Sequence, residues 1–155
     1  MASRLVRVLT MVVLALLGAA NVFAAANDCD RACLKQAMDQ YLAAVIKHEP
    51  SAAPLFVGFR QTENAVVVRP GTGMWKTMTG LGKLQRRYLD AVSGQAGYFG
   101  VVEEDTSSAI VTIRVRVENK KITEAEWFIA RKGDPGLNGV AQRSEEHTSE
   151  LQSQR

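Results

Sequence analysis

The sequence has few of the residues that carry metal and nucleophile chemistry. Its 155 residues include two cysteines and two histidines, and no histidine lies near the cysteines. A structural zinc site takes four ligands, so we expect no metal. The glycine-rich stretch GTGMWKTMTGLGK contains no G-x-x-x-x-G-K-[ST] motif, and the chain has no G-x-S-x-G. We therefore expect neither a phosphate-binding loop nor a serine nucleophile, and no cofactor.

A concentrated charge of one sign is also missing. The chain has 19 lysines and arginines against 16 acidic residues, a formal net charge of +3. Nucleic-acid and membrane-surface binding usually require a strong basic field. The KLQRR segment at 83–87 groups three cations, but such a group is typical of the solvated face of a helix. We expect no nucleic-acid partner and no membrane partner.

The longest apolar run near the N-terminus covers residues 8–17, which is shorter than the roughly 20 residues that span a bilayer. Two arginines precede this run and small residues follow it, as in a secretory signal peptide. We expect residues 1–26 to be the signal peptide, with cleavage after Ala24 or Ala26. The mature chain is then expected to be periplasmic or secreted.

The last thirteen residues, RSEEHTSELQSQR, resemble one reading frame of a common short-read sequencing adapter. We expect residues 143–155 to be a non-native, disordered tail. A solvated acidic tail is the alternative, because a segment this polar buries too little surface to order itself. Residues 27–142 then form a single domain, by the usual 100 to 200 residues per domain, and the domain is expected to be truncated if the native gene continues.

The two cysteines lie four residues apart in CDRAC. In a helix this spacing brings the two Cα atoms to about 6 Å, which a disulfide accepts. Export also favours oxidation. We expect a disulfide between Cys29 and Cys33, with a zinc site as the weaker alternative.

The segment from 31 to 47 has apolar residues at spacings of three and four, which predicts an amphipathic helix. It must end before Pro50, and Ser51 is expected to cap a short second helix through Leu55 and Phe56. His48, at the end of the first helix, is expected to cap carbonyl groups.

The valine-rich stretch TENAVVVRP predicts a strand that leads into the loop PGTGMW. The spacing of Leu81, Leu84, Tyr88 and Val92 predicts a third helix over 81–92, with Gly94 as its stop. Three long β segments follow, at 96–105, 107–119 and 120–131. The Asn119-Lys120 step between the last two predicts a hairpin turn.

The helical opening, the LF segment, the glycine-rich bend and the closing VRVENKKITEAEWF resemble the nuclear transport factor 2-like superfamily, including its SnoaL-like cyclases. The likeness extends over residues 30–131. CDRACLKQAMDQYLAAVIKHEP, followed by TEN and a Gly-Trp bend, resembles a secreted, functionally uncharacterised subgroup. The resemblance implies an α+β cone, in which a curved antiparallel sheet wraps a long N-terminal helix around an apolar pocket. It also implies a homodimer formed through the sheet.

Such cones use a few carboxylates or tyrosines in an apolar cavity, because a desolvated carboxyl group has a raised pKa and can exchange protons near neutral pH. With a two-residue turn, Glu124 and Glu126 would lie on the apolar face of the closing hairpin. With a turn one residue longer, they would form a charge ladder with Arg116 and Arg114. If the protein is an enzyme, we expect Glu126 to be catalytic.

Five further residues are candidates for binding a ligand. Glu63 and Asn64 open the predicted first strand beside Trp75, where the resemblance places the cavity mouth; Asn64 could instead satisfy a turn, and Trp75 could be core. Tyr41 and Tyr88 are expected to point inward from their helices and to line the pocket or to pack with satisfied hydroxyls.

Three functional classes remain. The first is a cofactor-free lyase, isomerase or hydrolase that acts on a small apolar molecule. The second is a non-catalytic binder of such a molecule. The third is an interaction or dimerisation module that uses the outer face of the sheet. A titrating acid inside a cavity would indicate the enzyme, and a filled core with an exposed apolar sheet would indicate the module.

Overall fold

The computed structural model describes residues 28–134 of the chain. The predicted signal peptide and the predicted adapter-derived tail lie outside these residues. Within 28–134, no helix is both long enough and apolar enough to cross a membrane.

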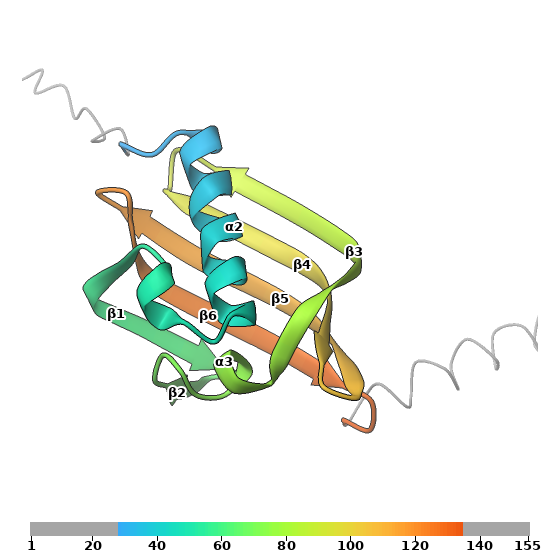
Figure 1. Cartoon of the computed structure of the whole chain (residues 1–155). Coiled ribbons are helices and arrows are strands. Elements are labelled where there is room, and N and C mark those ends of the chain that lie inside the picture. The colour runs from blue at the N-terminus through green and yellow to red at the C-terminus, as the bar shows by residue number, and fades with distance from the viewer. Residues whose placement is uncertain (1–27, 135–155) are drawn as a thin grey trace, which may run out of the picture.

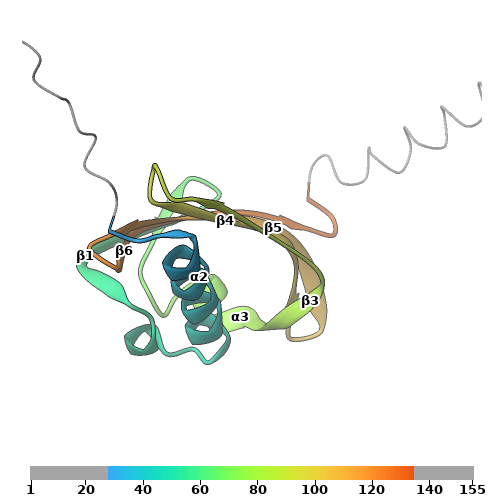
Figure 2. The same ribbon diagram turned by 90° about the horizontal axis from the view of Figure 1, so that it is seen from above.

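One strongly curved sheet wraps around one long helix (Figures 1 and 2). The six strands lie in the order β2-β1-β6-β5-β4-β3. The curved sheet around the helix agrees with the expected cone, but the sheet is mixed and not antiparallel throughout as expected. β1 runs parallel to β6, while every other neighbouring pair is antiparallel. The strands are β1 (Leu55–Glu63), β2 (Val66–Val68), β3 (Met78–Asp90), β4 (Gln95–Glu104), β5 (Ser107–Glu118) and β6 (Lys121–Arg131).

The helix α2 (Arg31–Ile46) confirms the predicted amphipathic helix. Asp30 caps it by accepting a hydrogen bond from the Cys33 N–H at 2.8 Å, which satisfies one of the amide groups left over at a helix start. The face that packs on the sheet is fully buried and carries Leu34, Met38, Tyr41, Leu42 and Val45.

The predicted disulfide is confirmed, since Cys29 and Cys33 are bonded with Cα atoms 5.2 Å apart. Cys29 is fully buried, so the bond ties the residues before α2 into the core. Together with the Asp30 cap, it fixes where the helix begins.

The predicted third helix over 81–92 is wrong. These residues belong to β3, which pairs with β4 from Met78 to Asp90. A bulge between Leu81 and Gln85 interrupts the in-and-out alternation of the strand, so the apolar residues fall at spacings that imitate a helix. Gly80 and Gly82, at the start of the predicted helix, also disfavour helix formation.

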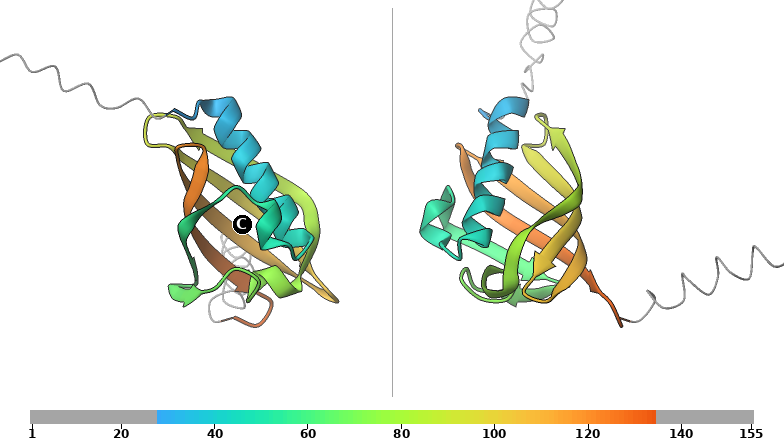
Figure 3. Two further views of the ribbon diagram at one scale, coloured as in Figure 1. Left: turned by 60° about the vertical axis from the view of Figure 1, so that its left-hand side comes forward. Right: turned by 45° about the vertical axis from the view of Figure 1, so that its right-hand side comes forward.

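The second helix is shorter than predicted. Only Pro50–Ala52 forms a 3-10 turn, and Leu55 already begins β1. The valine-rich stretch is the short strand β2, which folds back on β1 through a turn at Asn64 and Ala65, both with positive φ. Figure 3 shows this β1–β2 unit beside the short helix α3 (Met74–Thr77), at the end of the cone opposite the start of α2.

The hairpin at Asn119 and Lys120 is confirmed, with φ of 49° and 58° at the two turn residues, as in a two-residue turn. A bulge then shifts the register between Arg116 and Val117. In a two-residue hairpin without a bulge, each residue of β6 would lie on one particular face of the sheet. Beyond the bulge, each of these residues lies on the other face.

The concave face of the sheet holds the core. One row of cross-strand partners on this face runs from β1 to β3, and we refer to it as the concave row: Glu63, Trp127, Ile113, Tyr98 and Arg87. The three central members are fully buried beneath α2. The two ends of the row are charged, so the interior of the cone is apolar at its centre and polar at both rims.

Candidate functional site

The candidate site is a hydrogen-bond network at the β1 side of the cone. Gln61, only 1% exposed, is its centre. The Gln61 side-chain oxygen accepts hydrogen bonds from the Tyr41 hydroxyl and from the Trp75 indole, each at 2.8 Å. The Trp127 indole donates in turn to the Tyr41 oxygen at 2.9 Å. We call these four residues the Gln61 network.

Four elements of the chain position this network, since Tyr41 comes from α2, Trp75 from α3, Gln61 from β1 and Trp127 from β6. The Tyr41 ring meets Trp75 edge-on, with centroids 5.5 Å apart. Burial raises the pKa of the Tyr41 hydroxyl, so this group stays neutral and serves as both donor and acceptor. A fully paired polar cluster in an apolar core fixes one arrangement of its members.

Glu63 extends the network toward the rim of the cone. Its Oε1 accepts hydrogen bonds from the Gln61 side-chain amide at 3.0 Å and from the Met74 N–H at 2.9 Å. Burial raises the pKa of the Glu63 carboxyl, and these two hydrogen bonds only partly oppose the rise. Glu63 is therefore a part-buried acid that is easier to protonate than a surface glutamate.

The loop before α3 closes tightly on this carboxyl. Gly73 has a φ of 59°, and a Cβ at this position would collide with the Glu63 carboxylate. A glycine is needed there both for the backbone conformation and for the close approach. The loop thereby brings the Met74 N–H onto Glu63.

An ion pair lies at the same rim. Arg131 donates to both carboxylate oxygens of Glu104, at 2.7 and 2.9 Å, and the Thr77 hydroxyl donates to Glu104 at 2.5 Å. The hydrogen bond from Arg131 lowers the pKa of Glu104. The rim thus combines an acid that protonates readily with an acid that stays charged, and Arg131 also acts electrostatically on Glu63.

The structure brings together three of the predicted ligand-binding residues, Tyr41, Glu63 and Trp75. Tyr41 and Trp75 are fully buried and bonded within the protein. Asn64 is exposed, and its amide group bonds the backbone N–H and C=O of Ile129 at 2.7 and 3.0 Å. Asn64 therefore holds the end of β1 on β6 and forms part of the turn into β2, as the alternative prediction had it. Among the predicted ligand-binding residues, Glu63 is the acidic one.

Of the two arrangements predicted for Glu124 and Glu126, the charge ladder with Arg116 and Arg114 is confirmed and the buried apolar face is wrong. The catalytic role expected of Glu126 depended on the buried face. The cross-strand partner of Glu126 is Arg114, which donates to its carboxylate at 3.2 Å on the convex face. Glu124 likewise pairs with Arg60 at 3.1 Å and with Arg114 at 3.5 Å. The bulge after Arg116 produces this charge ladder, with the partners that a turn one residue longer would give.

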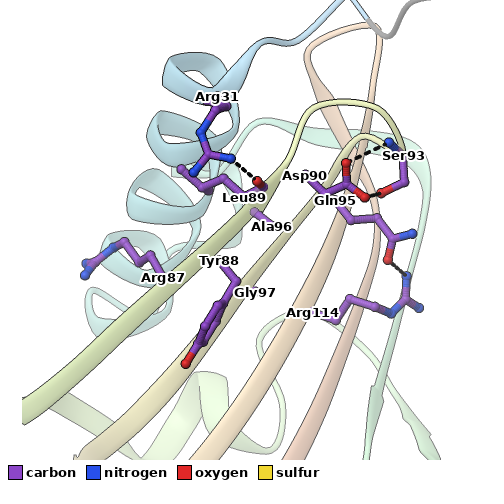
Figure 4. Close-up of a pocket in the computed structure, with 10 residues that line it drawn as sticks. All are labelled: Arg31, Arg87, Tyr88, Leu89, Asp90, Ser93, Gln95, Ala96, Gly97 and Arg114. Carbon is purple, nitrogen blue, oxygen red and sulfur yellow. Dashed lines mark hydrogen bonds between the residues drawn. The ribbon is translucent and has the colours of Figure 1, made fainter.

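The predicted inward orientation of Tyr88 is also wrong. Tyr88 is 61% exposed on the convex side of β3, because its segment is a strand. It borders an open depression of about 510 Å³ at the β3–β4 turn (Figure 4). Arg87 in this depression pairs with Asp39 on the helix side, whereas Arg114 pairs with Glu126 on the convex side. These arginines do not converge on one ligand position.

His48 lies at the end of α2, as predicted, but its Nδ1 bonds the backbone oxygen of Trp75 at 2.6 Å. It therefore links α2 to α3. No group of three potential metal-binding His, Cys, Asp or Glu side chains occurs in the described part of the chain.

Sequence reasoning missed Gln61, Trp127, Glu104 and Arg131. Gln61 and Glu63 share the alternation of a strand, which is visible once β1 is extended back to Leu55. Trp127 could have been found in the same way, from the inward alternation of Ala125, Trp127 and Ile129. Nothing in the sequence indicates that Glu104 and Arg131 meet.

No protein-family model and no curated protein matches the chain. Similar solved structures do exist. A "putative ketosteroid isomerase" from Kribbella flavida aligns with a TM-score of 0.54 and 9% identity, over 69% of this chain and 84% of that one. AclR, a "putative hydroxylase" from Streptomyces galilaeus, aligns with a TM-score of 0.54 and 12% identity, over 81% of this chain and 98% of that one.

A de novo designed protein with a curved β-sheet also aligns, with a TM-score of 0.53 and 14% identity over 74% of this chain and 95% of that one. The fold is that of the nuclear transport factor 2-like proteins. At these identities the likeness extends to the cone alone. A function must therefore be argued from the site of this chain.

Proposed function

We propose that the protein binds a small, largely apolar molecule at the rim of the cone and exchanges a proton with it through Glu63. The observation that carries this proposal is the environment of Glu63, a part-buried carboxyl whose pKa is raised by burial. An acid of this kind is suited to general acid–base chemistry near neutral pH.

The surrounding residues support this role. Gln61 and the Met74 N–H hold the Glu63 carboxylate in one orientation, and Gln61 is itself fixed by its network. Arg131 and Glu104 provide a charged pair next to it. The same cone occurs in proteins described as an isomerase and a hydroxylase, which agrees with an activity of this class. Export of the protein remains part of the proposal, and the disulfide agrees with it.

A direct test is the exchange of the α-protons of cyclohexanone in heavy water, followed by NMR. We expect the protein to accelerate the exchange and Glu63→Gln to abolish the acceleration, because the amide cannot take up the proton. Glu103→Gln, at an exposed acid of β4, is the matched control and should behave like the unchanged protein.

The outcome also separates the enzyme from the binder. Equal rates in the unchanged protein and in Glu63→Gln would overturn the catalytic role. Cyclohexanone that shifts the Met74 amide resonance without any exchange would instead support a non-catalytic binder.

A second candidate function is self-association through the convex face. Phe99, Ile110 and Phe128 are 36%, 42% and 55% exposed, and they fall in two adjacent cross-strand rows, Phe99–Thr112–Phe128 and Val101–Ile110–Ala130. The neighbouring rows carry the Arg60–Glu124 and Arg114–Glu126 pairs. We propose that the convex face of a second copy covers these three apolar residues. That face offers apolar surface to them and charged groups of both signs to the neighbouring ion pairs.

Sedimentation measures this association directly. We expect a dimer that Phe128→Glu converts to a monomer, while Val92→Glu, at an exposed turn position, leaves the dimer intact. A protein that is monomeric at its highest soluble concentration would exclude this second candidate.

A further inference from the structure

The two cysteines of the disulfide differ in their exposure to solvent. Cys29 is fully buried in the hydrophobic core, whereas Cys33 is partly exposed in the first turn of α2. In thiol–disulfide exchange a thiolate attacks one of the two sulfur atoms, and access helps to decide which sulfur reacts. A thiol in solution can therefore reach the bond at Cys33 but not at Cys29.

A depression of about 180 Å³ lies beside Cys33. Figure 1 shows the tip of the β5–β6 hairpin at the same end of the cone as the start of α2. The lining residues come from these two elements and from the loop before β1: Cys33, Gln36, Ala37, Gln40, Pro54 and Lys120. One water molecule needs only about 10–15 Å³, so the depression has room for a small molecule next to the partly exposed cysteine.

The polar side chains of this depression have no partners among the described residues. Gln36, Gln40 and Lys120 are exposed, and among residues 28–134 no hydrogen bond or ion pair involves their side chains. The lining contains no acidic residue, so the Lys120 ammonium group gives the depression a positive charge. The two amide groups can donate and accept hydrogen bonds. Together these groups favour a ligand that is small, polar and negatively charged.

Opening the disulfide leaves the contacts that hold the helix in place. The Asp30 carboxylate caps α2 through the Cys33 N–H at 2.8 Å, and the buried side chains of Leu34 and Leu42 pack the helix on the sheet. None of these contacts needs the bond between the two sulfur atoms. The Cys29 thiol stays close to Cys33, since the two Cα atoms are 5.2 Å apart. The bond can therefore close again, which makes an exchange at Cys33 reversible.

We propose that Cys33 is a site of thiol–disulfide exchange with a small thiol that carries a carboxylate group. The thiolate of the ligand attacks the Cys33 sulfur, and a new disulfide forms between them. The bond to Cys29 breaks, its electron pair stays on the Cys29 sulfur, and that thiolate takes up the proton that the ligand thiol released to the solvent. One disulfide replaces another, so the step needs no oxidant. The carboxylate of the bound ligand pairs with Lys120, and its other polar groups bond Gln36 and Gln40.

The first experiment maps the attack in the intact, oxidised chain with mercaptoacetate as the thiol. The reaction is stopped by N-ethylmaleimide in denaturant, which blocks every free thiol, and trypsin then cuts after Arg31, between the two cysteines. We expect mass spectrometry to find mercaptoacetate on Cys33 and N-ethylmaleimide on Cys29. Mercaptoacetate on Cys29, or on both cysteines equally, would overturn the proposal.

Single-cysteine variants measure the same preference without the closing reaction. Dithiodiglycolate, the disulfide of mercaptoacetate, should modify Cys33 in Cys29→Ser at least about tenfold faster than it modifies Cys29 in Cys33→Ser, because reactivity follows exposure. Equal rates, or no modification of Cys33 in either experiment, would contradict an exchange site at Cys33. Circular dichroism checks that both variants are folded, and the mapping in the intact chain does not depend on them.

The charge preference is tested with 2-mercaptoethanol, an uncharged thiol of similar size. Lys120→Gln should slow exchange with mercaptoacetate about threefold, the effect of one exposed ion pair, and leave the rate with 2-mercaptoethanol unchanged. Lys121→Gln, which removes an exposed lysine outside the lining, is the matched control and should slow neither thiol. An equal effect of Lys120→Gln on both thiols, or none on either, would overturn the preference for a carboxylate. Glu63→Gln should exchange like the unchanged chain, so this site and the proton-exchange site fail or succeed separately.

Discussion

Two glutamates on neighbouring strands, one on each face of the sheet, have opposite pKa shifts. On the concave face, Glu63 is held by Gln61 and the Met74 N–H, and burial raises its pKa. On the convex face, Glu124 lies between Arg60 and Arg114, and the hydrogen bond from Arg60 is the largest influence that lowers its pKa.

Glu104, which is also buried on the concave side, has a lowered pKa because Arg131 pairs with it. The comparison teaches that burial without an arginine partner raises the pKa of a glutamate, whereas an arginine partner lowers it.

The largest effect is expected from replacing, one at a time, two neighbouring aromatic residues on β6. Trp127 is fully buried, whereas Phe128 is 55% exposed on the other face. We expect Trp127→Ala to reduce the free energy of unfolding by about 3–5 kcal/mol, through lost burial and a cavity. At protein concentrations at which the chain is monomeric, Phe128→Ala should change it by less than about 1 kcal/mol. Denaturant unfolding measures both; similar losses would mean that the convex face is also covered.

The next effect concerns neighbouring polar residues on β1. Gln61→Ala leaves the Tyr41 hydroxyl and the Trp75 indole without their acceptor, so we expect a loss of about 2–3 kcal/mol. Arg60→Ala removes an ion pair with an arginine side chain that is 78% exposed and should cost about 0.5 kcal/mol or less. A Gln61→Ala variant as stable as Arg60→Ala would show that the network does not hold its four elements together.

The pH dependence of stability should have opposite signs at Glu63 and at Glu124. The raised pKa of Glu63 means that its contribution to stability is present below the usual glutamate range and is lost as the pH rises through its folded pKa. Glu63→Gln should therefore gain stability relative to the unchanged protein on going from acidic to neutral pH. The lowered pKa of Glu124 gives the reverse, so Glu124→Gln should lose stability over the same range.

Both changes should be below about 1 kcal/mol, because neither carboxyl is fully removed from solvent. Unfolding measured at a series of pH values would check them. The same sign in both variants would contradict the assignment of the two glutamates to different environments.

The smallest effect is expected at Glu126. Its side chain is 35% exposed and pairs with an Arg114 side chain that is 38% exposed. Glu126→Gln should change the free energy of unfolding by less than about 0.5 kcal/mol and should leave cyclohexanone exchange unchanged. If the exchange is lost in this variant, the proton-exchanging group lies on the convex face.

Local signals in the sequence predicted the elements that depend on local interactions. The spacing of Leu34, Met38 and Leu42 predicted α2, and Asn119-Lys120 predicted the last hairpin, because a helix face and a two-residue turn are determined by neighbouring residues. The disulfide followed from four-residue spacing in the same way. The resemblance supplied the cone.

The failures have one physical cause. A bulge in β3 hid the strand that contains Tyr88, and a bulge after Arg116 moved Glu126 to the other face. A one-residue shift in register moves every side chain beyond it to the other face of the sheet. No local sequence pattern predicts where such a bulge will form. The Gln61 network was missed for a related reason, since its members are brought together only by the tertiary fold.

The parallel pairing of β1 with β6 also has a consequence for the order of folding. Gln61 is the partner of Ala125, and Trp127 donates to Tyr41 across 86 positions of the chain. These contacts cannot form until the last strand has been synthesised, and closing such long loops is slow. A newly made chain would therefore keep β1 undocked, and the Tyr41 hydroxyl without the Trp127 indole, until β6 has been added.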